Sequence, residues 1–595
     1  MAMQGDAGRC RRIGRLVPLI ASVVCCAAAL PALAQDTTGV IIIDPDAPPV
    51  QLRSLRGPPP EVVSEAVAAY NDTTAFRSYG SQTVSSGTLI RGNVAVYRGT
   101  LRVVGRIIGN VTVVNGALIL GPLGTIEGDV LVVGGRMQSA PSARHTGALR
   151  EYADPAPVFR TATGSLEVRE RRPTLGDLAT ARTTFQAGAL KATLEVGTRG
   201  SYNRVEGLPV IAGPTFSFPT PNLGEVRMQV HGVIRTEKDQ TDQLGQFGWR
   251  AGFDYESRGR VRGGVTASWS SLVAPIEELQ LTPGEAGWSS FLLRRDYEDY
   301  YHAQGIAAGA HVYPVAGLRV GASVRFGDEL TVPASDPITL LRNDSPWRPN
   351  PLIDDGFYTT IRAEIAFDNR NSQLTPTSGW LVRASFERGS SDDVAPIALP
   401  TEVRDPIPTF RTYSFNKIWV DARIYARINQ ASRVNLRALG GGWLGGDPLP
   451  IQRRLSMGGP GILPGLPFRS QSCAPPSLTD PALTALCDRA IAAQAELRVR
   501  FPLRLRELLG ADEWLLLDRF FGGDQADVVF FSDAGKGWIA GDGPGRVPSN
   551  RIPVLGEWDY DAGIGLDLGG FALYLAKSLS TSESPRLTMR LQRRF

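Results

Sequence analysis

The chain has 595 residues, of which 43% are hydrophobic and 21% charged; it is too long for one ordinary domain and too balanced for a disordered chain. Its 63 lysines and arginines nearly cancel 59 aspartates and glutamates, and much of the formal charge of +4 comes from the first residues of the chain. This balance excludes the strongly basic surface that a nucleic acid requires, so we predict no nucleic-acid partner.

The N-terminus has the order of a secretory signal peptide. Four arginines precede an apolar stretch from about Leu16 to Leu30, and the small-residue pattern Ala32-Leu33-Ala34 follows. We therefore predict that residues 1–34 are a signal peptide cleaved after Ala34. Beyond it no run of roughly eighteen apolar residues occurs, so a chain that crosses a membrane must do so as a β-barrel.

Two cysteines remain after the signal peptide, Cys473 and Cys487, in a proline-rich stretch. In an oxidising compartment their spacing predicts a disulfide that closes one loop, worth about 3 kcal/mol on the chain-entropy model. Two free thiols are the alternative.

Residues 35–84 are rich in proline and aspartate at their start, and we predict a linker with a short helix over 61–70. Residues 85–138 then carry a quasi-repeat in which Gly92-Asn93, Gly109-Asn110 and Gly128-Asp129 each precede a β-branched run. Such a short repeat predicts a small β-solenoid, because one turn cannot bury its own apolar face. The stretch resembles the polymer-forming cytoskeletal (bactofilin-like) repeat, and a plain β-meander is the alternative.

Residues 139–185 are predicted to be a second linker, and residues 186–595 an all-β transmembrane antiparallel barrel of about sixteen strands. Apolar and polar residues alternate in this region, as a strand with one apolar and one polar face requires. A soluble sandwich would also fit the alternation, but the signal peptide and the long loops favour the barrel. The clearest alternating segments are 225–231, 318–326, 361–368 and 495–501.

The C-terminal residues have the pattern of a closing barrel strand. Leu587, Met589, Leu591 and Phe595 are predicted to share one face, and the last of them is a terminal aromatic. This looks like the C-terminal signal that the bacterial outer-membrane assembly machinery reads.

Several motifs, in their order along the chain, resemble the bacterial surface antigen superfamily, which includes the BamA/TamA-like outer-membrane assembly factors and two-partner-secretion transporters. Segments 202–208, 368–380 and 561–565 contribute to the resemblance. The strand motif is Phe531, Asp533 and Gly535, and the loop motif is Gly458, Gly459, Leu463, Pro464, Gly465 and Leu466.

The resemblance implies that a loop arginine enters the lumen and pairs with Asp533. In this chain Pro464 occupies the arginine position, so Asp533 needs another cation, since an unpaired buried carboxylate is costly. Arg469 is our candidate for this lumen lock, with Arg453 and Arg454 as second choices. An ordinary lumen-facing aspartate is the alternative. Region 35–185 also lacks the βααββ pattern of the polypeptide-transport-associated domains that client-handling relatives carry.

No enzyme chemistry is predicted. The four histidines, His145, His231, His302 and His311, are scattered without ligand spacing, so we predict no metal and no cofactor. The leading hypothesis is an outer-membrane barrel that aids insertion or export of polypeptides, with its N-terminal segment periplasmic. Outer-membrane lipid and unfolded outer-membrane or secreted polypeptides would be its partners. The alternatives are a passive or solute-transport pore with a tethering solenoid, and a structural anchor whose solenoid binds a periplasmic partner or itself.

Overall fold

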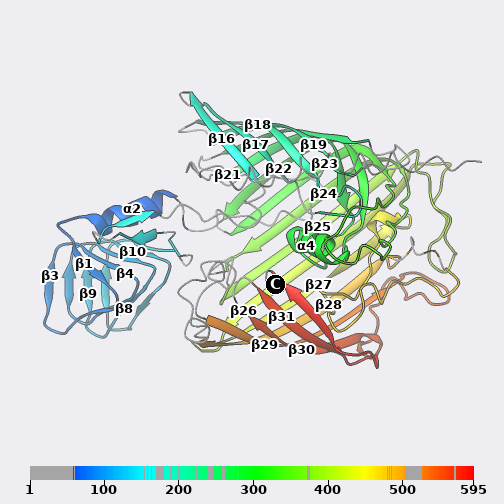
Figure 1. The fold of residues 1–595 in the computed structure, drawn as a ribbon. Coiled ribbons are helices and arrows are strands. Elements are labelled where there is room, and N and C mark those ends of the chain that lie inside the picture. Colours follow the sequence, from blue (N-terminus) through cyan, green and yellow to red (C-terminus); the bar gives the residue numbers. More distant parts are fainter. Residues whose placement is uncertain are drawn as a thin grey trace, which may run out of the picture. The chain divides into compact units, whose positions relative to one another are not determined.

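The described residues of the computed structural model form two compact units, one mainly within residues 58–168 and the other within residues 180–595 (Figure 1). The predicted signal peptide and the start of the first linker lie outside the described residues. These are residues 58, 60–168 and 180–595, except 153–154, 157, 162–163, 188–189, 199–201, 221–223, 238–244, 258–261, 278, 316, 371–375, 430, 479, 481–482, 484, 503–524, 569–570 and 592.

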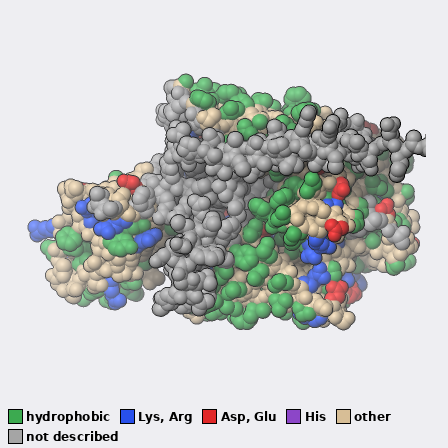
Figure 2. Space-filling model, in the orientation of Figure 1, with side chains coloured by type: hydrophobic (Ala, Val, Ile, Leu, Met, Phe, Trp, Pro, Cys, Tyr) green, Lys and Arg blue, Asp and Glu red, His purple; other side chains and the backbone are tan. Residues whose placement is uncertain are grey.

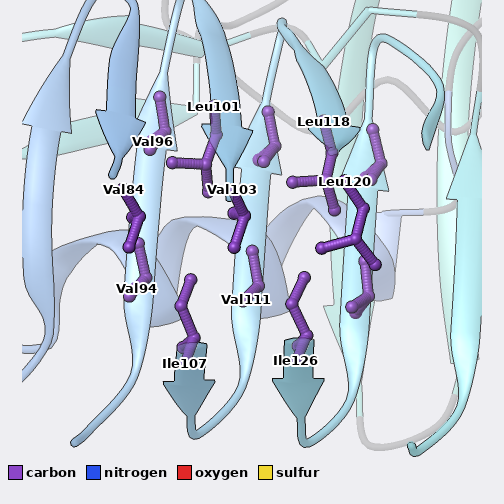
Figure 3. Close-up of a cluster of buried hydrophobic side chains, with 13 residues drawn as sticks. Val84, Val94, Val96, Leu101, Val103, Ile107, Val111, Leu118, Leu120 and Ile126 are labelled. Carbon is purple, nitrogen blue, oxygen red and sulfur yellow. The ribbon is translucent and has the colours of Figure 1, made fainter. Parts of the chain in front are cut away.

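The first unit is a parallel β-solenoid built from three sheets of five, four and four strands. Successive turns stack in register, as in Val94↔Val111 and Val111↔Val130. The inward side chains form one buried aliphatic cluster, in which residues of successive turns meet (Figure 3). The parallel pairing confirms the predicted solenoid and excludes the meander. Its strands are β1 (Phe76–Tyr79), β2 (Gln82–Val84), β3 (Leu89–Arg91), β4 (Val94–Tyr97), β5 (Thr100–Val103), β6 (Arg106–Ile108), β7 (Val111–Val114), β8 (Ala117–Leu120), β9 (Thr125–Glu127), β10 (Val130–Val133), β11 (Met137–Ser139), β12 (Arg144–Thr146) and β13 (Leu149–Tyr152).

The repeated Gly-Asn pairs form one corner of the solenoid. Gly109 has a φ of 149°, and a Cβ at this position would lie 2.3 Å from the carbonyl oxygen of Gly92 in the preceding turn. The following residues form a ladder, because Asn93 Oδ1 accepts from the Asn110 amide at 3.0 Å and Asn110 Oδ1 accepts from the Asp129 amide at 2.9 Å. Glycine is therefore required by close approach and positive φ, and the amide or carboxylate side chain by the ladder.

One sheet of the solenoid is buried on both faces. The helix α2 (Pro60–Asn71) packs against β4, β7 and β10, and a hairpin of β14 (Val158–Arg160) and β15 (Leu166–Val168) lies beside it. Asn71 joins the helix to the hairpin through two hydrogen bonds with the backbone of Leu166, at 2.7 and 2.8 Å. This second layer explains why β4, β7 and β10 are buried at every position rather than at alternate ones.

The structure corrects the predicted domain boundaries. The solenoid runs from Phe76 to Tyr152 rather than over 85–138, and β14 and β15 occupy part of the predicted linker 139–185. The terminal strands, with sequences FRSY and LREY, have no β-branched run because a terminal turn has only one neighbour to bury it. The large sheet begins at Thr180, six residues before the predicted start.

The second unit is one antiparallel sheet of 17 described strands in sequence order. This agrees with the predicted all-β barrel of about sixteen strands and adds one strand. Among the described residues no ladder joins the first strand to the last. The strands are β16 (Thr180–Ala187), β17 (Leu190–Thr198), β18 (Val210–Thr220), β19 (Gly224–Ile234), β20 (Phe247–Ser257), β21 (Arg262–Pro275), β22 (Tyr300–Val315), β23 (Leu318–Leu330), β24 (Gly356–Asp368), β25 (Gly379–Ser391), β26 (Tyr413–Arg427), β27 (Ser432–Gly446), β28 (Arg489–Pro502), β29 (Gln525–Trp538), β30 (Asp559–Asp567), β31 (Ala572–Ser578) and β32 (Arg586–Arg590).

Polar side chains line the inner face of this sheet and apolar side chains its outer face. On β28 the charged Glu496 and Arg498 are 1% and 0% exposed, whereas Leu497 between them is 38% exposed. Apolar side chains cover much of the visible outer surface (Figure 2). A soluble sandwich would bury the apolar face, so this inverted arrangement indicates a membrane barrel. Among the described helices, none is both long and apolar enough to cross a membrane.

Candidate functional site

The long connection between β27 and β28, residues 447–488, packs against the inner face of the sheet. Its apolar side chains meet Leu439 of β27 and Ala490 and Ala492 of β28 in one buried cluster. A short 3-10 helix (Ile451–Arg453) opens this inserted loop. The loop residues of the cluster are Leu455, Met457, Ile462, Leu463 and Leu466.

The loop motif forms the tip of this inserted loop. Gly458 and Gly459 have φ values of 97° and 123°, and the Gly459 amide donates to the Leu463 carbonyl at 3.2 Å, which closes the turn. The Gly465 amide then donates to Asp561 Oδ2 of β30 at 2.6 Å. A Cβ on Gly465 would lie 2.7 Å from the Asp561 Cβ, so the glycine allows the backbone to reach the sheet. A main-chain donor beside Pro464 thus binds a wall carboxylate.

Two glutamines that the sequence prediction missed hold the same tip. Gln494 of β28 donates from Nε2 to the carbonyl oxygens of Gly461 and Ile462, at 3.3 and 3.0 Å. Gln280 accepts from the Gly461 amide at 3.1 Å and donates to the Gly458 carbonyl at 3.2 Å. Both side chains are 2% exposed, so their amides satisfy backbone groups that would otherwise be buried without partners.

The predicted strand motif lies on β29 and faces the inserted loop. Phe531 and Asp533 are buried, and a Cβ on Gly535 would lie 2.9 Å from the Met457 Cε. Phe530, which precedes Phe531 on the strand, is 47% exposed on the outer face. The motif therefore supplies one wall of the site that the loop tip occupies.

The predicted pairing of Asp533 with Arg469 is wrong. Asp533 forms its ion pair with Arg594, whose guanidinium also lies 4.3 Å from the Phe531 ring centre and 3.6 Å from Glu496. The C-terminal segment after β32 places this arginine beside β29, so the lumen carboxylate obtains its cation from the end of the chain rather than from the loop.

Arg469 instead joins a buried ionic cluster in the loops. It pairs with Asp299 and lies 3.5 Å from Glu277. Arg204 pairs with Asp299 at 2.6 Å, and Arg348 pairs with it at 2.7 Å. Four separate connections between strands thus meet at one carboxylate, whose pKa their guanidinium groups lower despite its burial.

The second-choice arginines also have other partners. Arg453 binds Glu329 at 2.6 Å and Glu387 at 2.7 Å, on the inner faces of β23 and β25. Arg454 donates to backbone carbonyls, including that of Leu486 at 2.6 Å. Both therefore anchor the base of the inserted loop to the wall.

Sequence reasoning missed the role of the acidic run before β22, residues 296–299. Asp296 and Asp299 are buried and both bind Arg204, which lies in segment 202–208 between β17 and β18. This segment is a connection between two strands, and its Arg204 is 0% exposed. The only sequence signal of the cluster is the acidic run itself, with carboxylates at 296, 298 and 299; the fold alone brings Arg204, Arg348 and Arg469 to it.

Glu277, outside the strands, gives a pH-dependent prediction. Burial raises the pKa of Glu277 to about 7 from its ordinary 4.5, with Asp299 adding to the rise and Arg469 opposing it. The folded state therefore holds a proton that the unfolded state releases, and stability falls as pH rises from 4.5 through 7. We expect Glu277→Gln to raise the melting temperature at pH 8 and to leave it nearly unchanged at pH 5, as measured in detergent.

The matched control for this prediction is Glu402→Gln, because Glu402 is exposed in another connection. In this control, the difference in melting temperature between pH 5 and pH 8 should be the same as in the parent protein. A Glu277→Gln protein with the parent pH dependence would contradict the assignment.

The disulfide between Cys473 and Cys487 is formed, with the Cα atoms 5.0 Å apart. It joins two positions of the inserted loop, and Leu455 pairs with Cys487 through two backbone hydrogen bonds of 2.7 and 3.0 Å. The bridge therefore confines the distal half of the loop beside the segment that carries its motif. Among the described residues no group of three or more His, Cys, Asp or Glu could hold a metal ion.

The C-terminal residues divide between the two faces of the sheet. Leu587 and Met589 of β32 are 69% and 47% exposed, as a lipid-facing strand requires. Phe595, predicted to share that face, is 7% exposed. β32 ends at Arg590, and the chain beyond it no longer alternates, so the terminal aromatic is buried near the arginine that serves Asp533. Leu591 is half-buried.

The helix α4 (Pro283–Leu293), in the connection between β21 and β22, links the two ends of the sheet. Its Glu285 accepts from Arg590 Nε at 2.9 Å, Arg590 Nη2 at 3.1 Å and the Leu591 amide at 2.8 Å. Its Phe291 packs edge-on against Tyr202, which follows β17, with ring centres 5.2 Å apart. In Figure 1, α4 and the C-terminal end lie between the first strands and the last.

Comparisons with known proteins identify the domain that contains the site. Residues 353–570 match the Omp85 superfamily domain, a span that includes the inserted loop and the β29 motif. No curated protein sequence matches the chain. Among solved structures, BamA from Haemophilus ducreyi lacking POTRA domains 1-3 is 13% identical, with 73% of each chain covered and a TM-score of 0.38. CdiB from Acinetobacter baumannii is 11% identical, with 70% of this chain and 66% of that chain covered and a TM-score of 0.29. The match over residues 353–570 to the Omp85 superfamily domain confirms, for that span, the resemblance carried by the motifs.

Proposed function

We propose that this protein is an outer-membrane barrel that aids the insertion or export of polypeptides, with the solenoid on the periplasmic side. The proposal rests on one observation, that the first and last described strands of the large sheet are not paired with each other. Among the described residues β16 and β32 share no ladder, and α4 with its Glu285–Arg590 pair connects the region instead. An edge without a backbone partner can pair with a strand of another chain.

The Omp85 domain and the inverted polarity of the sheet support this role. The function needs no catalytic residue, because pairing at a strand edge gives an incoming strand its backbone hydrogen bonds. Outer-membrane lipid would contact the apolar outer face, and unfolded polypeptides would contact the edges. A periplasmic partner or a second solenoid would bind the first unit.

The inserted loop argues against the alternative of a passive solute pore. Its tip is buried, and its base binds the inner faces of β23 and β25 through Arg453. A pore would need this packed and ion-paired segment to leave the interior. The loop is therefore better suited to a barrel that works at its edges than to one that conducts through its centre.

Depletion of the protein in its host, followed by quantitative proteomics of the outer-membrane fraction, tests the proposal. A coordinated fall in other barrel proteins is the expected result. An unchanged barrel population together with altered solute permeability would replace the proposal with the pore. An unchanged population with loss of solenoid-bound partners would favour the structural anchor.

A further inference from the structure

The first strand of the large sheet, β16, is supernumerary. All 17 strands are antiparallel to their neighbours in sequence order, so the first and the last run in the same direction. An antiparallel ladder between β16 and β32 is therefore impossible. Strands β17 to β32 form an even set, as single-chain bacterial outer-membrane barrels do. Strand β17 is the first strand of that even set.

β16 covers the free edge of β17. Its ladder with β17 runs from Thr180↔Gly197 to Ala187↔Leu190, and the opposite edge of β17 pairs with β18. Every backbone position of the β17 edge from Leu190 to Gly197 is thus occupied by residues of the same chain.

The outer face of β16 carries one large apolar side chain, Phe185, which is 63% exposed and lies opposite Ala192 of β17. The exposed Ala181 and Thr183 of β16 lie opposite Val196 and Leu194 of β17, which are 44% and 46% exposed. Small and hydroxylated side chains gain less from contact with lipid than these aliphatic ones. A ladder of backbone hydrogen bonds joins β16 to β17, and a competing strand can replace that ladder.

We propose that β16 is an internal stand-in for a client strand: it occupies the edge of β17 until an amphipathic β-strand of an unfolded outer-membrane polypeptide displaces it and pairs antiparallel with β17. This inference rests on the proposed function and deepens it, because it names the docking edge and its resident occupant. Displacement exchanges one ladder for another, so no buried backbone group is left unpaired during the exchange.

A reversible lock tests this inference. The double variant Ala181→Cys/Val196→Cys places a cysteine pair at directly opposed positions and ties β16 to β17 in the oxidised protein. The control Ala322→Cys/Ala363→Cys places a matched outward-facing pair between β23 and β24, within the sheet. Each protein is reconstituted in phospholipid vesicles, and folding of a urea-unfolded eight-stranded outer-membrane barrel is followed by its gel mobility without heating.

We expect the oxidised lock to slow client folding at least about tenfold relative to the parent and reduction to restore the rate, while the control pair has no effect in either state. The parent protein receives the same reductant, because the native Cys473–Cys487 bridge is also reduced. An oxidised lock that folds the client as fast as the parent overturns the inference alone. If the parent itself gives no acceleration over empty vesicles, the proposed function fails.

A contact measurement separates a true docking edge from an indirect effect of the lock. A photo-crosslinking residue at Leu194 of β17 should capture the client in the parent and lose it in the oxidised lock. The same probe at Met589 of β32 serves as the comparison, since it lies on the other terminal strand. Capture from Met589 with none from Leu194 would place the docking edge on β32 and overturn the inference.

Discussion

Replacing Arg594 by alanine is expected to destabilise the barrel by about 3 kcal/mol or more, because the substitution leaves buried carboxylates without their cation. Asp533 on β29 lies directly opposite Asp561 on β30, and Arg594 pairs with the first of them. Asp533→Ala should cost less, since Arg594 keeps Glu496 at 3.6 Å as a partner. Urea unfolding of the detergent-solubilised protein measures both losses.

A double-mutant cycle assigns the partner. The effects of Asp533→Ala and Arg594→Ala should be strongly non-additive, whereas those of Asp533→Ala and Arg469→Ala should add within about 0.5 kcal/mol. Asp533→Asn in the Arg594→Ala background should recover part of the lost stability, because it removes one of two facing carboxylates. Coupling of Asp533 to Arg469 but not to Arg594 would contradict the structure and restore the loop-based lumen lock.

The local patterns of the sequence were sufficient for most of the fold. Alternation over 318–326 and 495–501 predicts strands whose inner faces are charged, and β23 and β28 have this arrangement. The glycines at 92, 109 and 128 predict solenoid corners because all three have positive φ, and at 109 and 128 the stacked turns also approach too closely for a Cβ. In both cases the signal lies within a few residues of the feature it predicts.

The partners within the site could not be predicted in the same way. Arg594 is 61 residues from Asp533, and it reaches this carboxylate only because the chain leaves the strand pattern after β32. Arg469 is 64 residues from Asp533 on its N-terminal side, a nearly equal separation, and the fold of the inserted loop directs it to Asp299. Charge pairing across a barrel interior depends on which connections fold inward, and the alternation of single strands carries no information on that point.

The same limit applies to the strand count. A length argument gives about sixteen strands, but it cannot detect an additional polar strand such as Thr180–Ala187, whose threonines and single aromatic resemble a linker. The strand is recognised through its ladder with β17. Because it makes the number of described strands odd, it cannot form an antiparallel ladder with β32, and its sequence alone does not indicate this.

Glu285→Gln is expected to release the C-terminal strand from α4. The carboxylate accepts two hydrogen bonds from Arg590 and one from the Leu591 amide, and both charged side chains are nearly fully buried. β32 pairs with β31 over only five residue positions, so this contact is a large part of what holds the strand. Loss of a buried ion pair worth about 3 kcal/mol corresponds to a hundredfold increase in local opening.

Hydrogen exchange of peptides covering residues 586–591, followed by mass spectrometry, measures this opening. The matched control is Glu583→Gln, because Glu583 forms a 3.7 Å pair with Arg586 of the same strand while both side chains are 44% exposed. Such a surface pair contributes little, so the control should exchange at nearly the parent rate. Equal protection in the parent and in Glu285→Gln would show that β32 is held without α4 and that the helix does not bridge the ends of the sheet. Faster exchange confined to Glu285→Gln would identify α4 as the element that holds the last strand in place where no ladder closes the sheet.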